Sequence, residues 1–455
     1  MTTYEQSVEV IITPWVEVVS ATGSSTGVTY TIKSGKTVPF AVGDQVSIEG
    51  FTNSAYNTSS GLVTTVTSTT FKITGPSATS GTTSSFTGGL AGLALGVNVA
   101  GQDVNIAYNN GLIDSVRVRG GRADITSQPE AMTATVDIIL DSATTYSPNL
   151  NQLMIVQVYD YPSSSYKRLF VGGITDIDVS VDSWFDAAGT YRYSITAASM
   201  LQKFQFRATT YNSSSIIASA GYYAGDWLGT ALTSPDIDGW FAGYGTITDN
   251  STLMHKRSAG TYYDYDIATS AASSARGNLH DRPDGKIYYT TFSASSSPTF
   301  YSLGTSVIMA DGLSAQKSIT EIVNTALVTS TNNAITTATA SDTTSQNAFG
   351  RRRGTKDTEA DVQATIDGQA TDYLAARKSP KWRYGSIVID LASPNLTDAD
   401  RQQLYTTRTN TAYSIAFPTQ LGGTTNVLVD NWSWSFTRGR STLTMQVCPF
   451  TDLHP

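Results

Sequence analysis

The sequence has few of the residues that enzymes and secreted modules use. Its 455 residues include one cysteine, Cys448, and three histidines, His255, His280 and His454. A single cysteine cannot form an internal disulfide, which excludes a disulfide-stapled module and predicts folding in a reducing cytoplasm. The start of the chain lacks a basic end followed by an apolar run, so no signal peptide is predicted. No segment approaches the roughly 20 apolar residues of a membrane span.

Charge is also scarce. Asp, Glu, Lys and Arg make up 15% of the chain, against about 25% in an average protein. The formal net charge of −8 argues against a general nucleic-acid binder, whose phosphate contacts need a basic face. Thr, Val and 24 Tyr are present instead, and such side chains pack well on a pleated sheet. The sequence therefore predicts a mainly β protein with minor α content, and its length predicts two or three domains.

Alternating apolar and polar residues mark several half-buried antiparallel strands. The clearest are 133–140, 176–182 and 191–197, and 432–447 reads as a hairpin with its turn at Arg438-Gly439. A hairpin of similar type spans 115–140, which suggests an internal duplication. Ser, Thr, Gly and β-formers dominate 19–95, where short strands are spaced regularly. We read 19–95 as an inserted β module, with a flexible linker as the alternative.

Helices are expected mainly in the second half of the chain. A four-residue apolar repeat predicts a helix over 358–377, which ends before Pro380. Ser318 and Glu321 are spaced as a capping pair, which predicts another helix over 322–327. Shorter helices are expected at 200–206, at 224–232 and from Thr397.

Titratable groups that could form a catalytic or metal site are few. Asp264, Asp266, His280 and Asp281 offer oxygen and imidazole ligands, but they lack the ordered spacing of a cation loop, so we expect solvated loop residues. Cys448 lies near the end of an expected strand, where a buried structural thiol is favoured over a reactive one.

Two further charged groups have a structural interpretation. Asp176 and Asp178 lie on one strand face, whereas glycosidase carboxylates come from different elements. Arg351, Arg352 and Arg353 form the only dense basic run. Guanidinium groups bind phosphate, but in an acidic protein a salt-bridge cluster between domains or subunits is the favoured reading. We predict no catalytic residue, no cofactor and no metal.

Eight segments form an ordered series of landmarks along the chain: Ser115–Arg122, Gln128–Glu130, Thr133–Val136, Phe170–Ile177, Tyr193–Ala197, Glu321–Asn324, Ser345–Arg351 and Trp432–Val447. In this order they resemble the phage baseplate-hub or minor tail proteins of long non-contractile tails. The resemblance covers Val97–Pro449 and rests on the order of the landmarks, which are degenerate one at a time. It does not extend to the 21–95 segment, which looks like a small β module inserted in several phage structural proteins.

The resemblance implies a homotrimeric hub whose subunits each carry two tail-tube-like β-barrels, so that three chains match a six-fold tube. The domains would be a first barrel (1–18 and 96–207), the inserted module (19–95), an irregular Tyr- and Ser-rich middle domain (208–316) and a second barrel (317–455). The implied partners are the distal tail ring protein, the C-terminus of the tape-measure protein and other minor tail proteins. DNA would pass without specific binding, and no membrane anchor is expected.

Three functions compete at this point. The first is a structural, non-enzymatic hub at the virion tail tip, assembled in the host cytoplasm, that joins tube to tip and lines the channel. The second is a tail adhesin that binds a host glycan through the inserted module or the Tyr-rich region, for which Tyr222, Tyr223 and Trp227 are the candidates, since aromatics stack on sugar rings. The third is a cell-wall hydrolase, which needs an acidic pair with separated pKa values, and no candidate is found.

Overall fold

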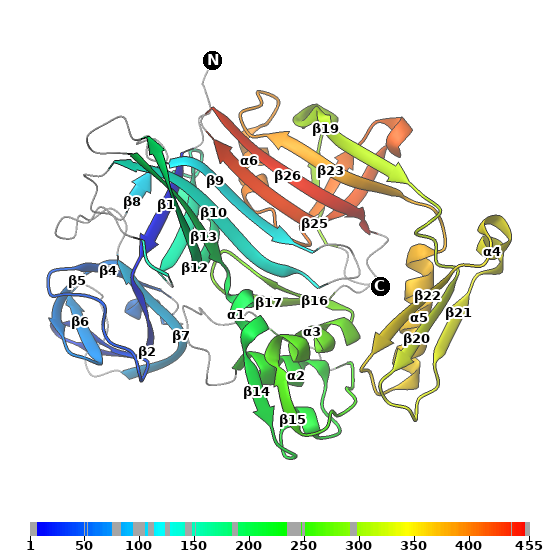
Figure 1. Ribbon diagram of the computed structural model, residues 1–455, viewed down its shortest axis with the longest axis horizontal. Coiled ribbons are helices and arrows are strands. Elements are labelled where there is room, and N and C mark those ends of the chain that lie inside the picture. The colour runs from blue at the N-terminus through cyan, green and yellow to red at the C-terminus, as the bar shows by residue number, and fades with distance from the viewer. Residues whose placement is uncertain are drawn as a thin grey trace.

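The computed structural model describes most of the chain, and its fold is mainly β, as the composition predicts. A large sheet forms the upper part of the molecule in Figure 1, with a small barrel, a helical cluster and an α/β unit attached to it. The described residues are 7–49, 51, 53–74, 83–93, 105–107, 113–122, 128–141, 148–150, 152–183, 190–233, 247, 251–291, 298–437 and 439–450.

The main sheet joins strands from both halves of the chain. Its order is β19-β23-β26-β25-β9-β10-β13-β12-β11-β1-β8, and β24 pairs with β25 and with β18. The two expected tube-like barrels are therefore not separate, because β25 of the second half pairs with β9 of the first. The strands are β1 (Val8–Thr13), β8 (Asn105–Ala107), β9 (Ile113–Gly121), β10 (Glu130–Asp141), β11 (Leu153–Asp160), β12 (Ser165–Ser183), β13 (Thr190–Ala198), β18 (Tyr301–Leu303), β19 (Ile308–Lys317), β23 (Trp382–Asp390), β24 (Ala412–Ala416), β25 (Thr424–Thr437) and β26 (Arg440–Pro449).

One continuous core lies under this sheet. The alternating apolar residues of β10, β25 and β26 all point into it, as a period of two requires. Trp432, Trp434 and Phe436 are fully buried, and the rings of Trp434 and Phe436 stack with centroids 6.0 Å apart. This shared core makes the two halves one folding unit.

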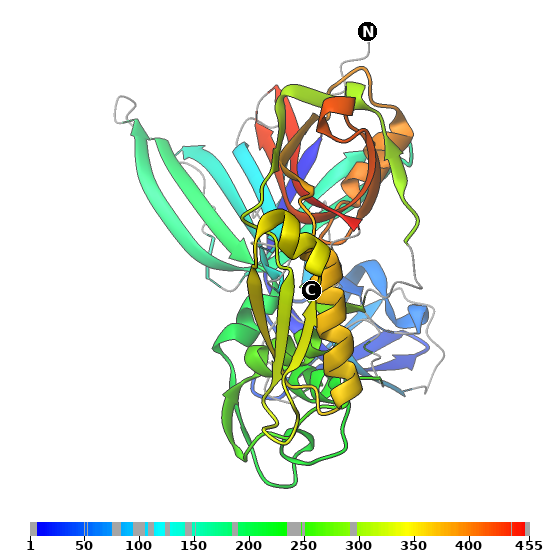
Figure 2. The same cartoon turned by 90° about the vertical axis from the view of Figure 1, so that its right-hand side faces the viewer.

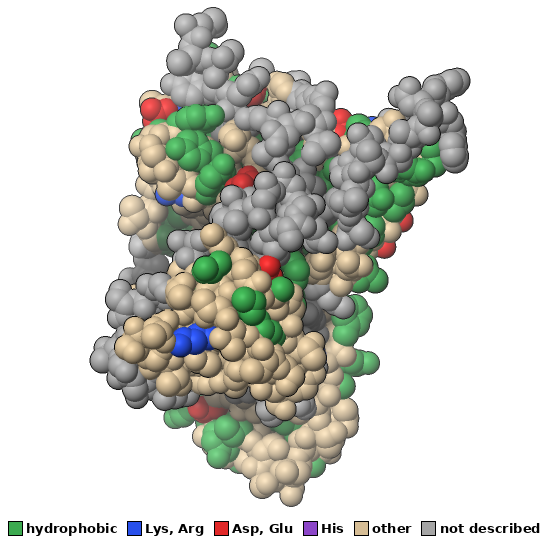
Figure 3. All heavy atoms as spheres, turned by 90° about the vertical axis from the view of Figure 1, so that its left-hand side faces the viewer, with side chains coloured by type: hydrophobic (Ala, Val, Ile, Leu, Met, Phe, Trp, Pro, Cys, Tyr) green, Lys and Arg blue, Asp and Glu red, His purple; other side chains and the backbone are tan. Residues whose placement is uncertain are grey.

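A closed barrel occupies most of the 19–95 range, and its first strand begins earlier, at Trp15. Tyr30 and Phe71 stack in its core with ring centroids 5.3 Å apart. The face of the barrel seen in Figure 3 shows few charged groups among its described residues, in keeping with the Ser- and Thr-rich sequence. The strands are β2 (Trp15–Ser24), β3 (Gly27–Ile32), β4 (Gln45–Glu49), β5 (Thr58–Val66), β6 (Thr70–Thr74) and β7 (Thr83–Leu93).

Regular elements fill much of the 208–316 range, which the sequence marks as irregular. Two helices, the β16–β17 hairpin and the two-stranded β14–β15 sheet surround a core that includes Trp227, Leu228, Ile267 and Ala271. No helix among the described residues is long and apolar enough to cross a membrane. The elements from 200 onward are α1 (Met200–Phe206), β14 (Ala208–Tyr211), α2 (Ala224–Thr233), β15 (Gly260–Tyr263), α3 (Asp264–Ser274), β16 (Gly277–Asp281) and β17 (Ile287–Thr291).

A small α/β unit lies between β19 and β23 and faces the viewer in Figure 2. The prediction of a helix over 322–327 is wrong, because Thr325–Ser330 forms a strand that pairs with two neighbouring strands. The helix expected over 358–377 begins later, at Gln363, because Thr358 still belongs to a strand. The elements are β20 (Thr325–Ser330), β21 (Ala338–Ser341), α4 (Thr343–Phe349), β22 (Arg353–Thr358) and α5 (Gln363–Arg377).

The helix expected from Thr397 is confirmed as α6 (Asp398–Tyr405). The Thr397 hydroxyl accepts a hydrogen bond from the Asp400 N–H at 3.1 Å, and the Asp400 carboxylate accepts one from the Thr397 N–H at 2.8 Å. This capping box satisfies two backbone donors that the first turn would otherwise leave unpaired. Leu404 and Tyr405 then pack into the core of the main sheet.

Replacing Thr397 with alanine should lower the free energy of unfolding by about 1 kcal/mol, because the cap's acceptor is lost. Thr397→Ser keeps the hydroxyl and should keep most of the stability. Chemical denaturation of both variants tests this. An equal loss in the two would show that the hydroxyl does not cap the helix.

Candidate assembly site

The main sheet contains the same strand path twice. In the first half the pairs are β9·β10, β10·β13, β13·β12 and β12·β11, all antiparallel. In the second half the corresponding pairs are β19·β23, β23·β26, β26·β25 and β25·β24, also antiparallel. The order of strands in each half is the same, so the sheet consists of two equivalent units side by side.

Irregularities in the strand pairing support this equivalence. A register shift interrupts β12 between Ile174 and Asp176, and one interrupts β25 at the same place, between Val429 and Asn431. The residues after the shift in β12 correspond one to one with the residues after the shift in β25, so that Val179 corresponds to Trp434.

The duplication suggested by the sequence is therefore present, but the hairpins were matched wrongly. The counterpart of the last hairpin, β25–β26, is β12–β13 and not the hairpin at 115–140. The counterparts of β9 and β10 are β19 and β23, and the α/β unit inserted between these two hides the hairpin in the sequence.

A seam between β9 and β25 joins the two units. Trp432, Trp434 and Phe436 lie opposite Gly120, Val118 and Val116. A Cβ on Gly120 would lie 2.9 Å from Cζ2 of Trp432, so only glycine allows the indole to pack against this strand.

A buried ion pair closes one end of this seam. The Arg122 side chain is 2% exposed, and its Nε donates to Oδ1 of Asp430 at 2.7 Å. The backbone N–H of Arg122 also donates to the Asp430 carbonyl at 3.0 Å. Cys448 lies against the same carboxylate, with Sγ 3.4 Å from Asp430 Oδ1, and burial raises the pKa of its thiol. The thiol is thus structural and unreactive at neutral pH.

Removing the Arg122 side chain should cost about 3–5 kcal/mol of unfolding free energy, because the Asp430 charge is then buried without its partner. Arg192→Ala is the matched control. Arg192 pairs with Asp114 at 2.6 Å, but both side chains are more than a third exposed, so its loss should cost about 1 kcal/mol or less. Equal effects in a denaturation experiment would contradict the role of the seam.

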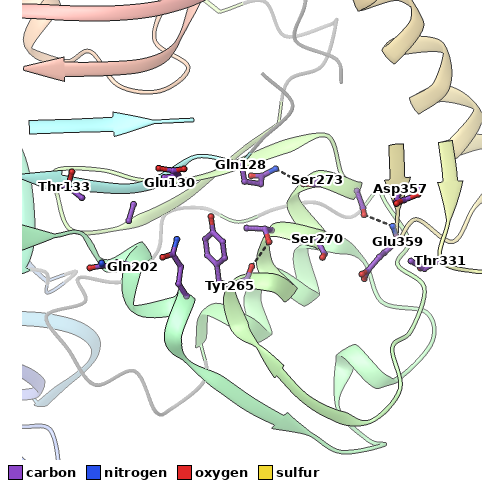
Figure 4. Close-up of a pocket in the computed structure, with 15 residues that line it drawn as sticks. Gln128, Glu130, Thr133, Gln202, Tyr265, Ser270, Ser273, Thr331, Asp357 and Glu359 are labelled. Carbon is purple, nitrogen blue, oxygen red and sulfur yellow. Dashed lines mark hydrogen bonds between the residues drawn. The ribbon is translucent and has the colours of Figure 1, made fainter. Parts of the chain in front are cut away.

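A polar cleft of about 760 Å³ lies where β10, α1, α3 and β22 meet (Figure 4). The Gln128 amide donates to Ser273 Oγ at 2.9 Å and to the Gly277 carbonyl at 3.0 Å, which fixes one wall. Glu130, Asp357 and Glu359 supply its carboxylates. No histidine or cysteine lines it, so no nucleophile in the cleft has an imidazole base beside it.

The four residues considered as cation ligands do not converge. Asp264 is buried, forms an ion pair with Arg207 in which Oδ2 lies 2.6 Å from Nε, and accepts a hydrogen bond from the Tyr211 hydroxyl at 2.6 Å, while Asp266 is exposed on the same helix. His280 and Asp281 lie on β16 and are buried rather than solvated. Within the described part of the chain, no group of three or more acidic, histidine or cysteine side chains is placed to hold a metal.

Asp281 fixes the middle segment, the helical cluster that runs from β14 to β17, to the main sheet. Its carboxylate accepts from the Met132 N–H at 3.2 Å and from the Ser199 hydroxyl. Burial raises the pKa of Asp281 to about 7, an effect partly offset by the hydrogen bond from the Met132 N–H and by the Arg408 charge. Burial, together with the Arg282 charge, lowers the pKa of the neighbouring His280 to about 4. The two shifts have opposite effects on stability as pH changes.

The raised pKa of Asp281 gives a pH prediction. A raised pKa in the folded protein contributes stability that is complete below pH 3.8 and is lost as pH rises through about 7. The unfolding free energy of the parent minus that of Asp281→Asn should therefore fall between pH 5 and pH 8. Denaturation at both pH values measures it, with the exposed Asp266→Asn as control. A difference independent of pH would contradict the assignment.

The remaining sequence candidates lie apart. Asp176 and Asp178 are exposed and come from the same strand, β12. Arg351 and Arg352 lie between α4 and β22, Arg353 begins β22, and none of the three forms an ion pair with another described residue. The expected salt-bridge cluster is thus not formed within the described chain, and a contact to another subunit stays a prediction.

The aromatic residues considered for glycan binding do not form one surface. Trp227 is fully buried in the core of the middle segment, with Arg257 over its ring. Tyr223 is 37% exposed and Tyr222 is half-buried. Trp227 thus holds the fold together and offers no face to a sugar.

Comparison with known proteins finds likeness only at the level of structure. No protein-family model and no curated protein matches the sequence. A tail protein from Neisseria meningitidis matches with a TM-score of 0.52 at 12% identity, over 75% of this chain and 95% of that chain. The two proteins share their fold. The expected likeness to tail proteins is confirmed at the level of the fold, and the likeness to baseplate hubs in particular stays a prediction.

Two further solved structures match less closely. The 43 kDa tail protein of prophage MuSo2 from Shewanella oneidensis has a TM-score of 0.49 at 11% identity, over 77% of this chain and 96% of that chain. An E. coli component of the type VI secretion system, which exhibits structural similarity to the T4 bacteriophage tail proteins gp27 and gp5, has a TM-score of 0.41 at 9% identity. The match covers 75% of this chain and 74% of that chain.

Proposed function

We propose that this chain is a structural hub of a phage-type tail, placed at the tail tip, where it joins the tube to the tip. The observation that carries the proposal is the repeated strand path, whose two units are joined edge to edge in a fold shared with the tail protein from Neisseria meningitidis. A protein that repeats one unit within its chain can match a symmetry twice its own copy number.

The repeated unit supports the homotrimer that the resemblance to tail hubs implies. Three chains with two equivalent units each present six units, which matches a six-fold tube, and closed symmetry leaves no strand edge exposed. The net charge of −8 would let DNA pass along the channel without binding to it. The partners proposed are the distal tail ring protein, the end of the tape-measure protein and other minor tail proteins. The site of action is the virion, after assembly in the host cytoplasm.

An assembly role without enzymatic activity agrees with the chemistry of the cleft. Its lining contains carboxylates, hydroxyls and amides but no imidazole or thiol. The carboxylate of Glu359 is paired with Arg257 and so is not free to act as a base. Trp227, one of the candidate sugar-binding residues of the adhesin alternative, is buried, and no other observation favours that alternative.

The proposal predicts a purified protein with three times the 48.5 kDa mass of one chain. Light scattering after size exclusion measures the mass, and an antibody against residues 21–95 should label only the tail tip in electron micrographs of particles. A monomer at micromolar concentration, together with particles unlabelled at the tip, would contradict the hub.

A further inference from the structure

Two strand segments of the main sheet lack a described neighbour on one side. Inside the chain, residues 431–437 of β25 pair with β9. The corresponding residues of β12, 176–182, extend beyond β11, and no described strand pairs with their outer edge. The counterpart of β9 is β19, which ends the sheet. One chain thus carries both halves of a second seam, on opposite sides of the main sheet (Figure 1).

The free part of β12 exposes apolar side chains. Val179 and Val181 are 54% and 38% exposed, whereas their counterparts Trp434 and Phe436 are fully buried. The strands project from the body of the molecule (Figure 2), and hydrophobic side chains line the projecting end (upper right in Figure 3). An apolar strand edge of this kind pairs readily with another strand.

We propose that residues 176–182 of β12 pair antiparallel with β19 of a second copy of this chain, in the register of the internal seam. This inference rests on the proposed hub, and it adds the surfaces through which the copies meet. It requires no rearrangement, because each edge is already part of a formed sheet.

The register follows from the equivalent pairs. Phe436 lies opposite Val116 in the internal seam. Val181 corresponds to Phe436, because Val181 lies seven residues after Ile174 and Phe436 lies seven residues after Val429, the residues at which the two register shifts begin. Leu313 of β19 pairs with Ile387 of β23, and Val116 of β9 pairs with Val136 of β10. Because Ile387 and Val136 are equivalent residues, Leu313 corresponds to Val116.

Val181 of one copy is therefore expected opposite Leu313 of the next. Two residues earlier on β12, Val179 is expected opposite Ala315. Both pairs lie on the apolar face of the sheet, where Leu313 and Ala315 already pack against the core. The new seam would continue that core from one copy to the next.

Charge favours this pairing over a symmetric one. Asp176 and Asp178 lie on the polar face of β12, so two β12 edges facing each other would bring like charges together, which destabilises a sheet. The facing segment of β19, 313–317, contains no acidic residue and ends in Lys317. The contact is consequently head-to-tail, the type that closes into rings.

A cysteine cross-link tests the register. Opposed residues of antiparallel strands have Cα atoms about 4.5–5.5 Å apart, which lies within disulfide range. Full-length chain carrying both Val181→Cys and Leu313→Cys should, after mild oxidation, run as covalent oligomers on a denaturing gel without reductant. Ser180→Cys with Leu313→Cys places the thiols on opposite faces and should stay monomeric on the gel. The buried Cys448 is common to both.

Assembly of the same variants before oxidation separates this inference from the proposed function. If both variants form oligomers and these cross-link to the same extent, or not at all, the proposed β12–β19 seam is wrong and the proposed hub is unaffected. A monomeric parent would overturn both. In addition, Val181→Asp should keep the circular dichroism spectrum of the parent, since the side chain is exposed, and should lose the oligomer. An intact oligomer in that variant would also overturn the seam.

Discussion

Backbone pairing between β9 and β25 is the interaction on which the architecture depends. Seven residue pairs join strands that lie more than 300 positions apart in the sequence. Without that seam the two units would each expose an open strand edge and half of a core, because Trp432, Trp434 and Phe436 would lose the strand beside them. The Arg122–Asp430 ion pair and the close approach at Gly120 fix the register of the seam.

The other parts of the chain are inserted around this two-unit sheet without interrupting it. The small barrel follows β1, the helical segment follows β13, and the α/β unit lies between β19 and β23. Each has its own apolar core, and Asp281 and its hydrogen bonds tie the helical segment to the sheet at Met132 and Ser199. Peripheral units can differ in such a design while the sheet keeps the geometry that assembly needs.

Local patterns predicted much of the secondary structure. The alternation in 133–140, 176–182 and 191–197 predicted the strands of the first unit, and Thr397 and Asp400 indicated a helix start that the capping box explains. The pairing of distant strands left no local signal, so the match of β12–β13 with β25–β26 was missed. The capping pair at Ser318 and Glu321 misled, because pairing of β20 with two strands outweighs a weak helical preference.

Burial explains the errors in the candidate site. Trp227, His280 and Asp281 read as surface or loop residues in the sequence, but tertiary packing buries all three. The central claim is that equivalent units meet alternately within one chain and between chains. Electron cryomicroscopy of the purified oligomer tests it most directly. The account predicts a ring of six similar β units with a paired strand edge at every junction, and a single unpaired chain, or units that meet through the inserted parts, would contradict it.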